Sequence, residues 1–218
     1  MFFRPKNYAI MINPGLTHAW INIPKNASSF CQKVFDDNGW TMCHTYDLVD
    51  GILSAHTISK IIVLRDPVER WISGFSQCMA DSSQSLSTIL DLLENNAFWT
   101  TVFFNPVFDD HTEHQYRFIG NTQNVKYIYM QSRSTTGTIS DPNRFYRDLT
   151  DYVISTNSSS NFQYWKEPTN PAENNKKKFA INSKLRAILK EYKTYYDSLK
   201  NCYKKDYGLI NTLERFTV

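Results

Sequence analysis

The segment from residue 61 to residue 75 constrains the fold more than any other part of the chain. It begins with four apolar residues, three of them β-branched, and such a run is typical of a fully buried parallel strand. Asp66 then suits the cap of a helix and Pro67 its first turn, so the strand ends at Arg65. Apolar residues recur at helical spacing from here to about Ala80. The segment therefore predicts a buried strand followed directly by an amphipathic helix.

The rest of the chain repeats this alternation of short strands and helices. We expect strands at residues 18–23, 40–44, 60–65 and 125–130, and helices at 30–38, 46–55, 67–80, 87–104, 142–154 and 182–207. This order predicts an α/β fold with a central, mainly parallel sheet of four or five strands flanked by helices. Residues 1–16 are expected to be a leader tucked against the domain. The 218 residues suffice for a single domain with a sizeable core, and two full domains are not expected.

Composition and charge exclude several classes of protein. A net charge of +3 is too small to indicate nucleic-acid binding, although it is compatible with small anionic ligands. The four cysteines show neither Cys-x-x-Cys spacing nor paired histidines, so we expect free thiols in a reducing compartment and no metal site. No stretch is typical of a signal peptide or long enough to span a membrane, so we expect a cytoplasmic protein without membrane contact.

A second strand-to-helix turn lies earlier, between the strand at 18–23 and the helix that follows Phe30. Backbone N–H groups at such a turn point outward, and the helix dipole adds partial positive charge. Lys25 contributes a full charge, and Ser28 and Ser29 contribute hydroxyl donors. The turn therefore has the chemistry of a phosphate cradle, without the glycines of a Walker A loop. The alternative is a serine-capped helix with an exposed lysine.

The later segment offers a matching anion site. A parallel strand delivers Arg65 to the carboxyl edge of the sheet, where open α/β sheets bind ligands. Ser73 follows two turns into the next helix, and an arginine with a hydroxyl makes a plausible phosphate site. The alternative is an arginine in a surface salt bridge and a serine that only packs.

Together the two turns resemble the sulfotransferases that use 3′-phosphoadenosine 5′-phosphosulfate (PAPS), especially the carbohydrate sulfotransferases. The first motif of that family, Pro-Lys-x-x-(Ser/Thr)-(Ser/Thr), is present as Pro24, Lys25, Asn26, Ala27, Ser28 and Ser29, followed by Phe30. The second, Arg-(Asp/His)-Pro-x-x-Arg-x-x-Ser, is present as Arg65, Asp66, Pro67, Arg70 and Ser73 at the family spacing. The resemblance is sharp over about residues 18–75 and loose elsewhere.

The resemblance implies a P-loop-like sulfotransferase fold over residues 1–218. The nucleotide-binding core would span about 18–80, acceptor-side helices and loops about 81–175, and a closing helix about 180–207. It also implies that the loop from Lys25 to Phe30 grips the 5′-phosphosulfate, and that Arg65 and Ser73 hold the 3′-phosphate. Arg70 would be structural, paired with a neighbouring acid.

The implied reaction moves the sulfuryl group of PAPS to a hydroxyl or amine, with a carbohydrate as the expected acceptor and 3′-phosphoadenosine 5′-phosphate (PAP) as product. No metal is required. Lys25 would stabilise the leaving phosphate. The sequence indicates neither the acceptor itself nor the oligomeric state.

A hydroxyl acceptor needs a base, and histidine suits that role near neutral pH. We expect His44 to be this base, since it closes the second predicted strand at the carboxyl edge of the sheet. His56, nearer the opposite edge, is the alternative. Asp47 is a further candidate, either as a base or as a residue that orients His44. Some members of the family carry their base at the end of this second strand. Four polar residues before the last predicted strand are expected to line the acceptor cleft: His111, His114, Gln115 and Arg117. A metal cluster around those histidines is the less favoured alternative.

Two other functions remain open from the sequence. One is a nucleotide kinase or another phosphotransferase, against which the missing Walker A loop argues. The other is a non-catalytic module that binds PAP without turnover. The lysines at 176–178 are either a solvated run or a cover for the nucleotide.

Overall fold

The computed structural model describes residues 9–43, 46–119, 123–130, 144–156 and 176–216, with the side chains of 46–48 excepted. Within these ranges the chain is a mixed α/β protein built on one six-stranded sheet. His44, a predicted base, lies outside the described residues, as does the side chain of Asp47.

The sheet has the strand order β3-β1-β2-β4-β5-β6. Three neighbouring pairs, β2 with β4, β4 with β5 and β5 with β6, are parallel, whereas β1 is antiparallel to both of its neighbours. The sheet is therefore mostly parallel. The strands are β1 (Ile10–Ile12), β2 (His18–Ile21), β3 (Thr41–Cys43), β4 (Ser59–Arg65), β5 (Val125–Met130) and β6 (Glu214–Arg215).

The expected sheet of four or five strands is corrected to six. The first added strand, β1, falls within residues 1–16, which were predicted to be a leader. Its three residues are buried between β2 and β3, and a run that short carries no readable periodicity. The other added strand, β6, has only two residues at the opposite edge.

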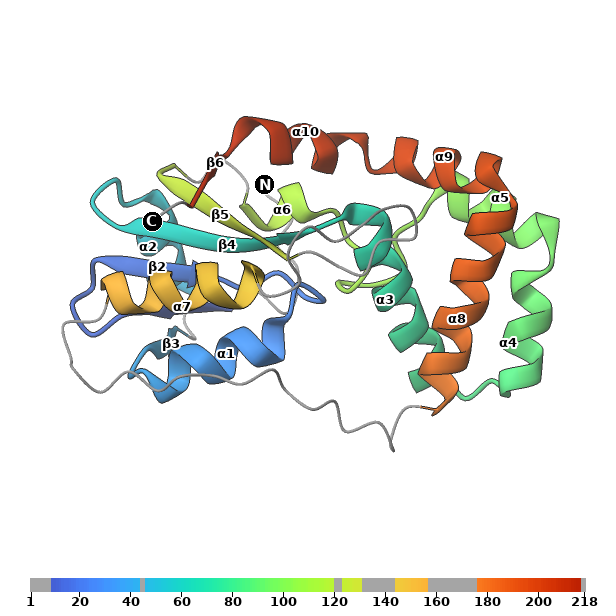
Figure 1. The fold of residues 1–218 in the computed structure, drawn as a ribbon, viewed down its shortest axis with the longest axis horizontal. Coiled ribbons are helices and arrows are strands. Elements are labelled where there is room, and N and C mark those ends of the chain that lie inside the picture. The colour runs from blue at the N-terminus through green and yellow to red at the C-terminus, as the bar shows by residue number, and fades with distance from the viewer. Residues whose placement is uncertain (1–8, 44–45, 120–122, 131–143, 157–175, 217–218) are drawn as a thin grey trace.

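Helices cover both faces of the sheet (Figure 1). On one face α1 and α7 pack on residues such as Trp20, Val63 and Ile128. On the other, α2, α6 and α10 pack on residues such as Ile21 and Leu64. These helices are α1 (Ser28–Asp37), α2 (Tyr46–Ser54), α6 (Gln115–Ile119), α7 (Arg144–Thr156) and α10 (Lys204–Thr212).

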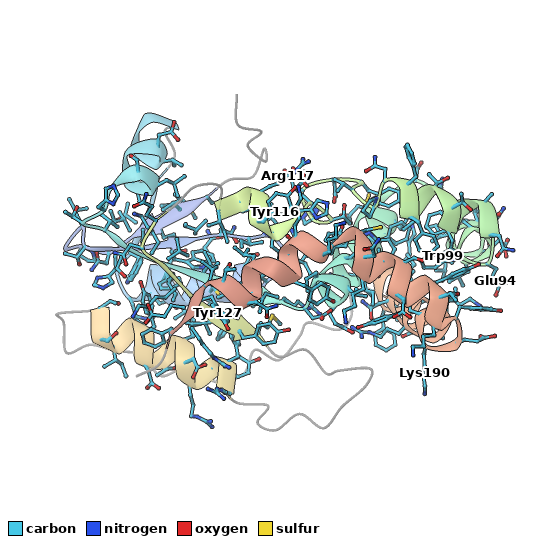
Figure 2. All side chains as sticks on the ribbon, turned by 90° about the horizontal axis from the view of Figure 1, so that it is seen from above. Glu94, Trp99, Tyr116, Arg117, Tyr127 and Lys190 are labelled. Carbon is cyan, nitrogen blue, oxygen red and sulfur yellow. The ribbon has the colours of Figure 1, made fainter. Side chains whose placement is uncertain are left out.

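A separate group of helices lies beyond the carboxyl ends of the parallel strands, at the right of Figure 1. Its core is centred on Trp71, Phe75 and Trp99, all almost fully buried. Figure 2 shows the two ends of the molecule, with Tyr127 on the sheet, Trp99 and Glu94 in the helical group, and Tyr116 and Arg117 of α6 between them. The helices of this group are α3 (Pro67–Asp81), α4 (Leu86–Leu93), α5 (Asn96–Phe104), α8 (Lys176–Glu191) and α9 (Lys193–Cys202).

Two long predicted helices are each divided. The predicted helix 87–104 breaks between α4 and α5, because the Asn95 side chain accepts the N–H of Ala97 at 2.8 Å and caps a new helix. The predicted helix 182–207 is three helices, α8, α9 and α10, and α8 begins earlier, at Lys176. The chain can therefore follow the helical group in α8 and α9 and return to the sheet in α10.

Candidate functional site

The turn between β2 and α1 has an unusual backbone. Lys25 and Ala27 have φ values of 66° and 58°, in the left-handed region that side chains normally avoid. When left-handed residues alternate with a residue of ordinary backbone conformation, successive N–H groups point toward one side. This is the arrangement of an anion-binding nest. Ala27 is also the N-cap of α1 and offers no side-chain hydrogen bond, so the first N–H groups of the helix have no capping side chain.

The side chains of this turn divide between support and exposure. Asn26 is buried, and its amide donates to the Val63 carbonyl and to Gln115 Oε1, each at 2.7 Å. Ser28 Oγ donates to the Ile23 carbonyl at 3.0 Å, while Ser29 is exposed. Phe30 packs its ring against two aromatic rings of α7. Of the residues predicted to bind a nucleotide here, Asn26, Ser28 and Phe30 therefore have side chains that support the turn.

Arg65 stands where β4 ends, beside this turn. Its Nη1 donates to the Lys25 carbonyl at 3.2 Å, so the two predicted anion loops touch. Gln115 fixes the same corner, because its Oε1 accepts the Arg65 N–H at 3.2 Å and its Nε2 donates to the Arg65 carbonyl at 2.9 Å. The adjacency of parallel β2 and β4 brings the loops together, and Gln115 holds them at their meeting point.

Arg65 is largely buried and shares one carboxylate with a second arginine. Its Nη2 is 3.8 Å from Glu69 Oε2, while Arg186 of α8 contacts both oxygens of Glu69 at 2.6 and 2.5 Å. Burial lowers the pKa of Arg65, and Glu69 works in the opposite direction. Since the bidentate contact goes to Arg186, two guanidinium charges share one carboxylate.

The start of α3 follows the prediction. Asp66 Oδ1 accepts the N–H of Glu69 at 3.0 Å as an N-cap, and Pro67 occupies the first turn. The other oxygen of Asp66 accepts the hydroxyl of Tyr207 at 3.0 Å, which ties the cap to α10. The expected capping role of Asp66 is confirmed.

Two lysine amines meet over α3. Lys25 Nζ is 3.5 Å from Gln77 Oε1, and Lys178 Nζ of α8 donates to the same oxygen at 2.8 Å. Burial, with a smaller effect from the charge of Lys178, lowers the pKa of Lys25 to about 8, although Asp109 and Asp81 act to raise it. Neither amine forms an ion pair with any residue that the structure describes, so this pair is a candidate anion site.

The three lysines at the start of α8 have separate roles. Lys176 is exposed, and Lys177 donates to the Ser82 and Gln84 carbonyls at 2.9 and 2.8 Å, which anchors the helix to the end of α3. Only Lys178 reaches the candidate site. The run therefore combines one exposed residue, one anchor and one site residue.

Ser73 and Gly74 lie on α3 between Arg65 and Gln77. The Ser73 hydroxyl has no hydrogen-bond partner among the described side chains and carbonyls, and the residue is only partly buried. A Cβ on Gly74 would lie 2.3 Å from the carbonyl oxygen of His111. Glycine therefore lets the segment around His111 contact the helix beside Ser73.

The predicted partner of Arg70 is corrected. Arg70 is structural, as expected, but it binds carbonyl oxygens instead of an acid side chain. Its Nε donates to Pro24 at 2.8 Å, its Nη2 to Asp110 at 3.1 Å, and its Nη1 to Glu113. A fork of five fixed donors suits a site where three carbonyls converge, and the motif spacing alone does not identify those partners.

The four residues predicted for an acceptor cleft separate in the structure. His111 lies against α3 and forms a 2.9 Å contact with Asp109, and Gln115 is buried as the brace described above. His114 and Arg117 line a cavity of about 580 Å³ between α5, α6 and α9. The other residues that line it are Phe103, Phe104, Asn105, Pro106, Val107, Glu113, Asn201 and Cys202.

The remaining predicted groups are placed as follows. His56 is exposed and precedes β4, at the edge of the sheet opposite Arg65. The four cysteines carry free thiols. Within the described ranges no three potential metal ligands lie close enough to hold an ion, and no helix there is both long and apolar enough to cross a bilayer.

Sequence reasoning missed the brace at Gln115, the Glu69–Arg186 pair and the contact of Asp109 with His111. The first two join residues 50 and 117 positions apart, so no local spacing indicates them. The third is a two-residue spacing in a polar loop, a pattern common in turns. Comparison with protein-family models, curated proteins and solved structures finds no match to this chain.

Proposed function

We propose that this protein is a sulfotransferase that moves the sulfuryl group of PAPS to a hydroxyl, with a carbohydrate as the acceptor class. One observation carries the proposal: Arg65 Nη1 donates to the carbonyl of Lys25, so the loops that resemble the two phosphate-binding motifs of that family are in direct contact. A nucleoside with phosphates at its 5′ and 3′ positions needs two cationic corners side by side.

The loop of Lys25 is the proposed 5′ site. Its left-handed residues and the uncapped first turn of α1 supply N–H donors, and Lys25 and Lys178 supply charge. As the S–O bond to the leaving phosphate breaks, negative charge grows on the bridging oxygen. A preorganised donor at that position contributes about 2.7–4 kcal/mol to the transition state, or roughly 10²–10³ in kcat.

Arg65 and Ser73 form the proposed 3′ site. Arg65 Nε is buried with no hydrogen-bond partner among the described atoms, and the Ser73 hydroxyl is likewise unused there. A phosphate group offers acceptor oxygens for such donors, and guanidinium geometry suits phosphate.

The acceptor needs a base for its proton and a cleft for its ring. His44 is the base named by the sequence. The cavity beside α6 is proposed to hold a part of the acceptor sugar away from the reacting hydroxyl, because His114 and Arg117 line it together with two phenylalanines and no residue of the two phosphate loops does. Such a mixture of hydrogen-bonding groups and aromatic rings suits a sugar.

Calorimetric titration with PAP tests the proposal. We expect Lys25→Ala to weaken PAP binding by about 10- to 150-fold, since a hydrogen bond to a charged group contributes about 1.5–3 kcal/mol. Arg65→Ala should weaken PAP binding similarly. Ser73→Ala should also weaken it, and this variant tests the 3′ site while leaving the buried guanidinium of Arg65 in place. Lys33→Ala, which removes an exposed lysine of α1 that pairs with Asp37, is the matched control.

Unchanged PAP affinity in both Lys25→Ala and Arg65→Ala would refute the assignment of the two loops. Tighter binding of ATP–Mg²⁺ than of PAP would favour the phosphotransferase alternative. PAP binding without transfer of labelled sulfate to monosaccharides or water would favour the non-catalytic module.

A further inference from the structure

The segment 109–112 reaches the same face of α3 as the amine of Lys25. Gly74 allows this approach, because any Cβ there would lie within 2.7 Å of the carbonyl carbon and oxygen of His111. The Cβ of His111 would be 3.2 Å from the Cβ added at Gly74. The side chain of His111 thus starts at the surface of α3, against Gly74.

Lys25 meets α3 one turn further along, at Gln77. Residues three apart lie on one face of a helix and are separated by about 4.5 Å of rise. Asp109 is also one of the two carboxylates that raise the pKa of Lys25, against the larger effect of burial. The lysine amine and the 109–111 segment therefore border the same region of the site.

Asp109 holds the imidazole of His111 in a defined orientation. Its Oδ2 is 2.9 Å from His111 Nδ1, and its Oδ1 accepts the backbone N–H of His111, also at 2.9 Å. Burial raises the pKa of Asp109, but the hydrogen bonds and charge of His111, together with the N–H of Thr112, lower the pKa overall. An ionised carboxylate only accepts, so the hydrogen-bond network assigns the proton to Nδ1 and leaves the lone pair on Nε2.

The imidazole is also accessible. About a third of the His111 side chain is exposed, and Nε2 has no hydrogen-bond partner in the described part of the chain. An oriented, accessible imidazole with a free Nε2 beside a cationic donor site is what a general base requires.

We propose that His111 is the base that takes the proton of the acceptor, and that Asp109 is the residue that positions it. This inference rests on the proposed sulfotransferase function. The acceptor oxygen forms a bond to sulfur while the bond from sulfur to the bridging oxygen of PAPS breaks. The electron pair stays on the phosphate of PAP beside Lys25, and the proton passes to Nε2 and then to water.

The first test is an NMR titration of the histidine ring signals, with His111→Gln used to assign the resonance. Saturating PAP should shift the ring signals of His111, because the bound phosphates change the electrostatic environment of a neighbouring imidazole. Asp109 is in contact with the ring, and the charged groups that act on the neighbouring Lys25 are Lys178, Asp109, Asp81 and Arg70. His18, at the opposite end of β2, should keep its signals.

The second test measures transfer of labelled sulfate from PAPS to water and to monosaccharides. His111→Ala and His111→Gln should keep PAP affinity and lower kcat by about 10²–10⁴-fold, the usual contribution of a general base. Added imidazole should restore rate to His111→Ala. Asp109→Asn should lower kcat by less than the two His111 variants do. It should also shift the acidic limb of the pH profile of kcat to lower pH, because an amide no longer stabilises imidazolium.

The outcomes are distinguishable. If the wild type does not bind PAP, the proposed function fails, and the base assignment fails with it. If PAP binds and transfer proceeds, an unchanged kcat in both His111 variants overturns the inference alone. So does a loss of rate in His44→Ala or His56→Ala without one at His111. A loss at His111 that imidazole does not rescue, together with a lower melting temperature, would show a structural role and also overturn it.

Discussion

Gly74→Ala is the substitution for which the structure makes the sharpest quantitative prediction. The added Cβ would lie 2.3 Å from the His111 carbonyl oxygen and 2.7 Å from its carbon, both backbone atoms. An ordinary contact is at least 3.4 Å, so α3 or the 109–112 segment must move by roughly 1 Å. Overpacking of this kind costs about 1–3 kcal/mol, and more where backbone resists.

Alanine is also the better helix former, and this partly offsets the clash. The gain is about 0.5–1 kcal/mol within a helix. A net loss of roughly 1–2 kcal/mol would lower Tm by about 2–8 °C in a chain of this length. Differential scanning calorimetry of the two proteins at one pH measures the shift.

Gly208→Ala is the matched control. Gly208 lies in α10, and no heavy atom of the described residues comes within 4 Å of the position of its Cβ. The same substitution should therefore leave Tm unchanged or raise it. A Gly74→Ala protein as stable as the wild type would refute the close packing of the 109–112 segment on α3.

Two further predictions concern charge. Glu69→Gln should destabilise the protein by about 3–5 kcal/mol in urea unfolding, since it leaves Arg65 and Arg186 without their shared carboxylate. Glu94→Gln, which removes the charge of an exposed ion pair with Lys184, is the control. Equal unfolding midpoints for the two variants would contradict the argument. Lys25 has its pKa lowered from 10.5 to about 8 by burial, so it is charged below that pH and neutral above it. PAP affinity should therefore fall as pH rises through about 8, and Lys25→Arg should remove that fall; a wild-type affinity that stays constant to pH 9.5 would count against a contact between Lys25 and phosphate.

The part of the fold that local chemistry specifies was predicted well. The strand ends at Arg65 and the helix starts at Pro67 as expected, because a β-branched run, a capping aspartate and a first-turn proline all act within a few residues. Their far ends, at Ser59 and Asp81, each lie one residue beyond the prediction. The strand predicted at 125–130 is β5, whose β-branched and aromatic residues favour a strand locally. In contrast, β1 depends on two long-range pairings, and the breaks at Tyr192 and Tyr203 contain neither glycine nor proline.

The candidate site was predictable to the level of its loops. That the loops after β2 and β4 lie side by side follows from parallel pairing, and both motifs were found by their spacing. Which side chains support the loops was not predictable. Gln115 was expected at the acceptor and is instead a brace, because only the folded chain brings α6 under the two strand ends.

Arg70 gives the site a permanent background charge. Its three donors reach only carbonyl oxygens, which are dipoles and leave the positive charge in place. Burial lowers the pKa of Arg70 to about 10, so the guanidinium still carries its proton throughout the physiological range. Arg70 also lowers the pKa of Lys25, which shows that its field extends to the loop above it. An anion arriving at this loop therefore meets two kinds of attraction: a fixed one from beneath, and an adjustable one from an amine whose proton depends on the surrounding pH.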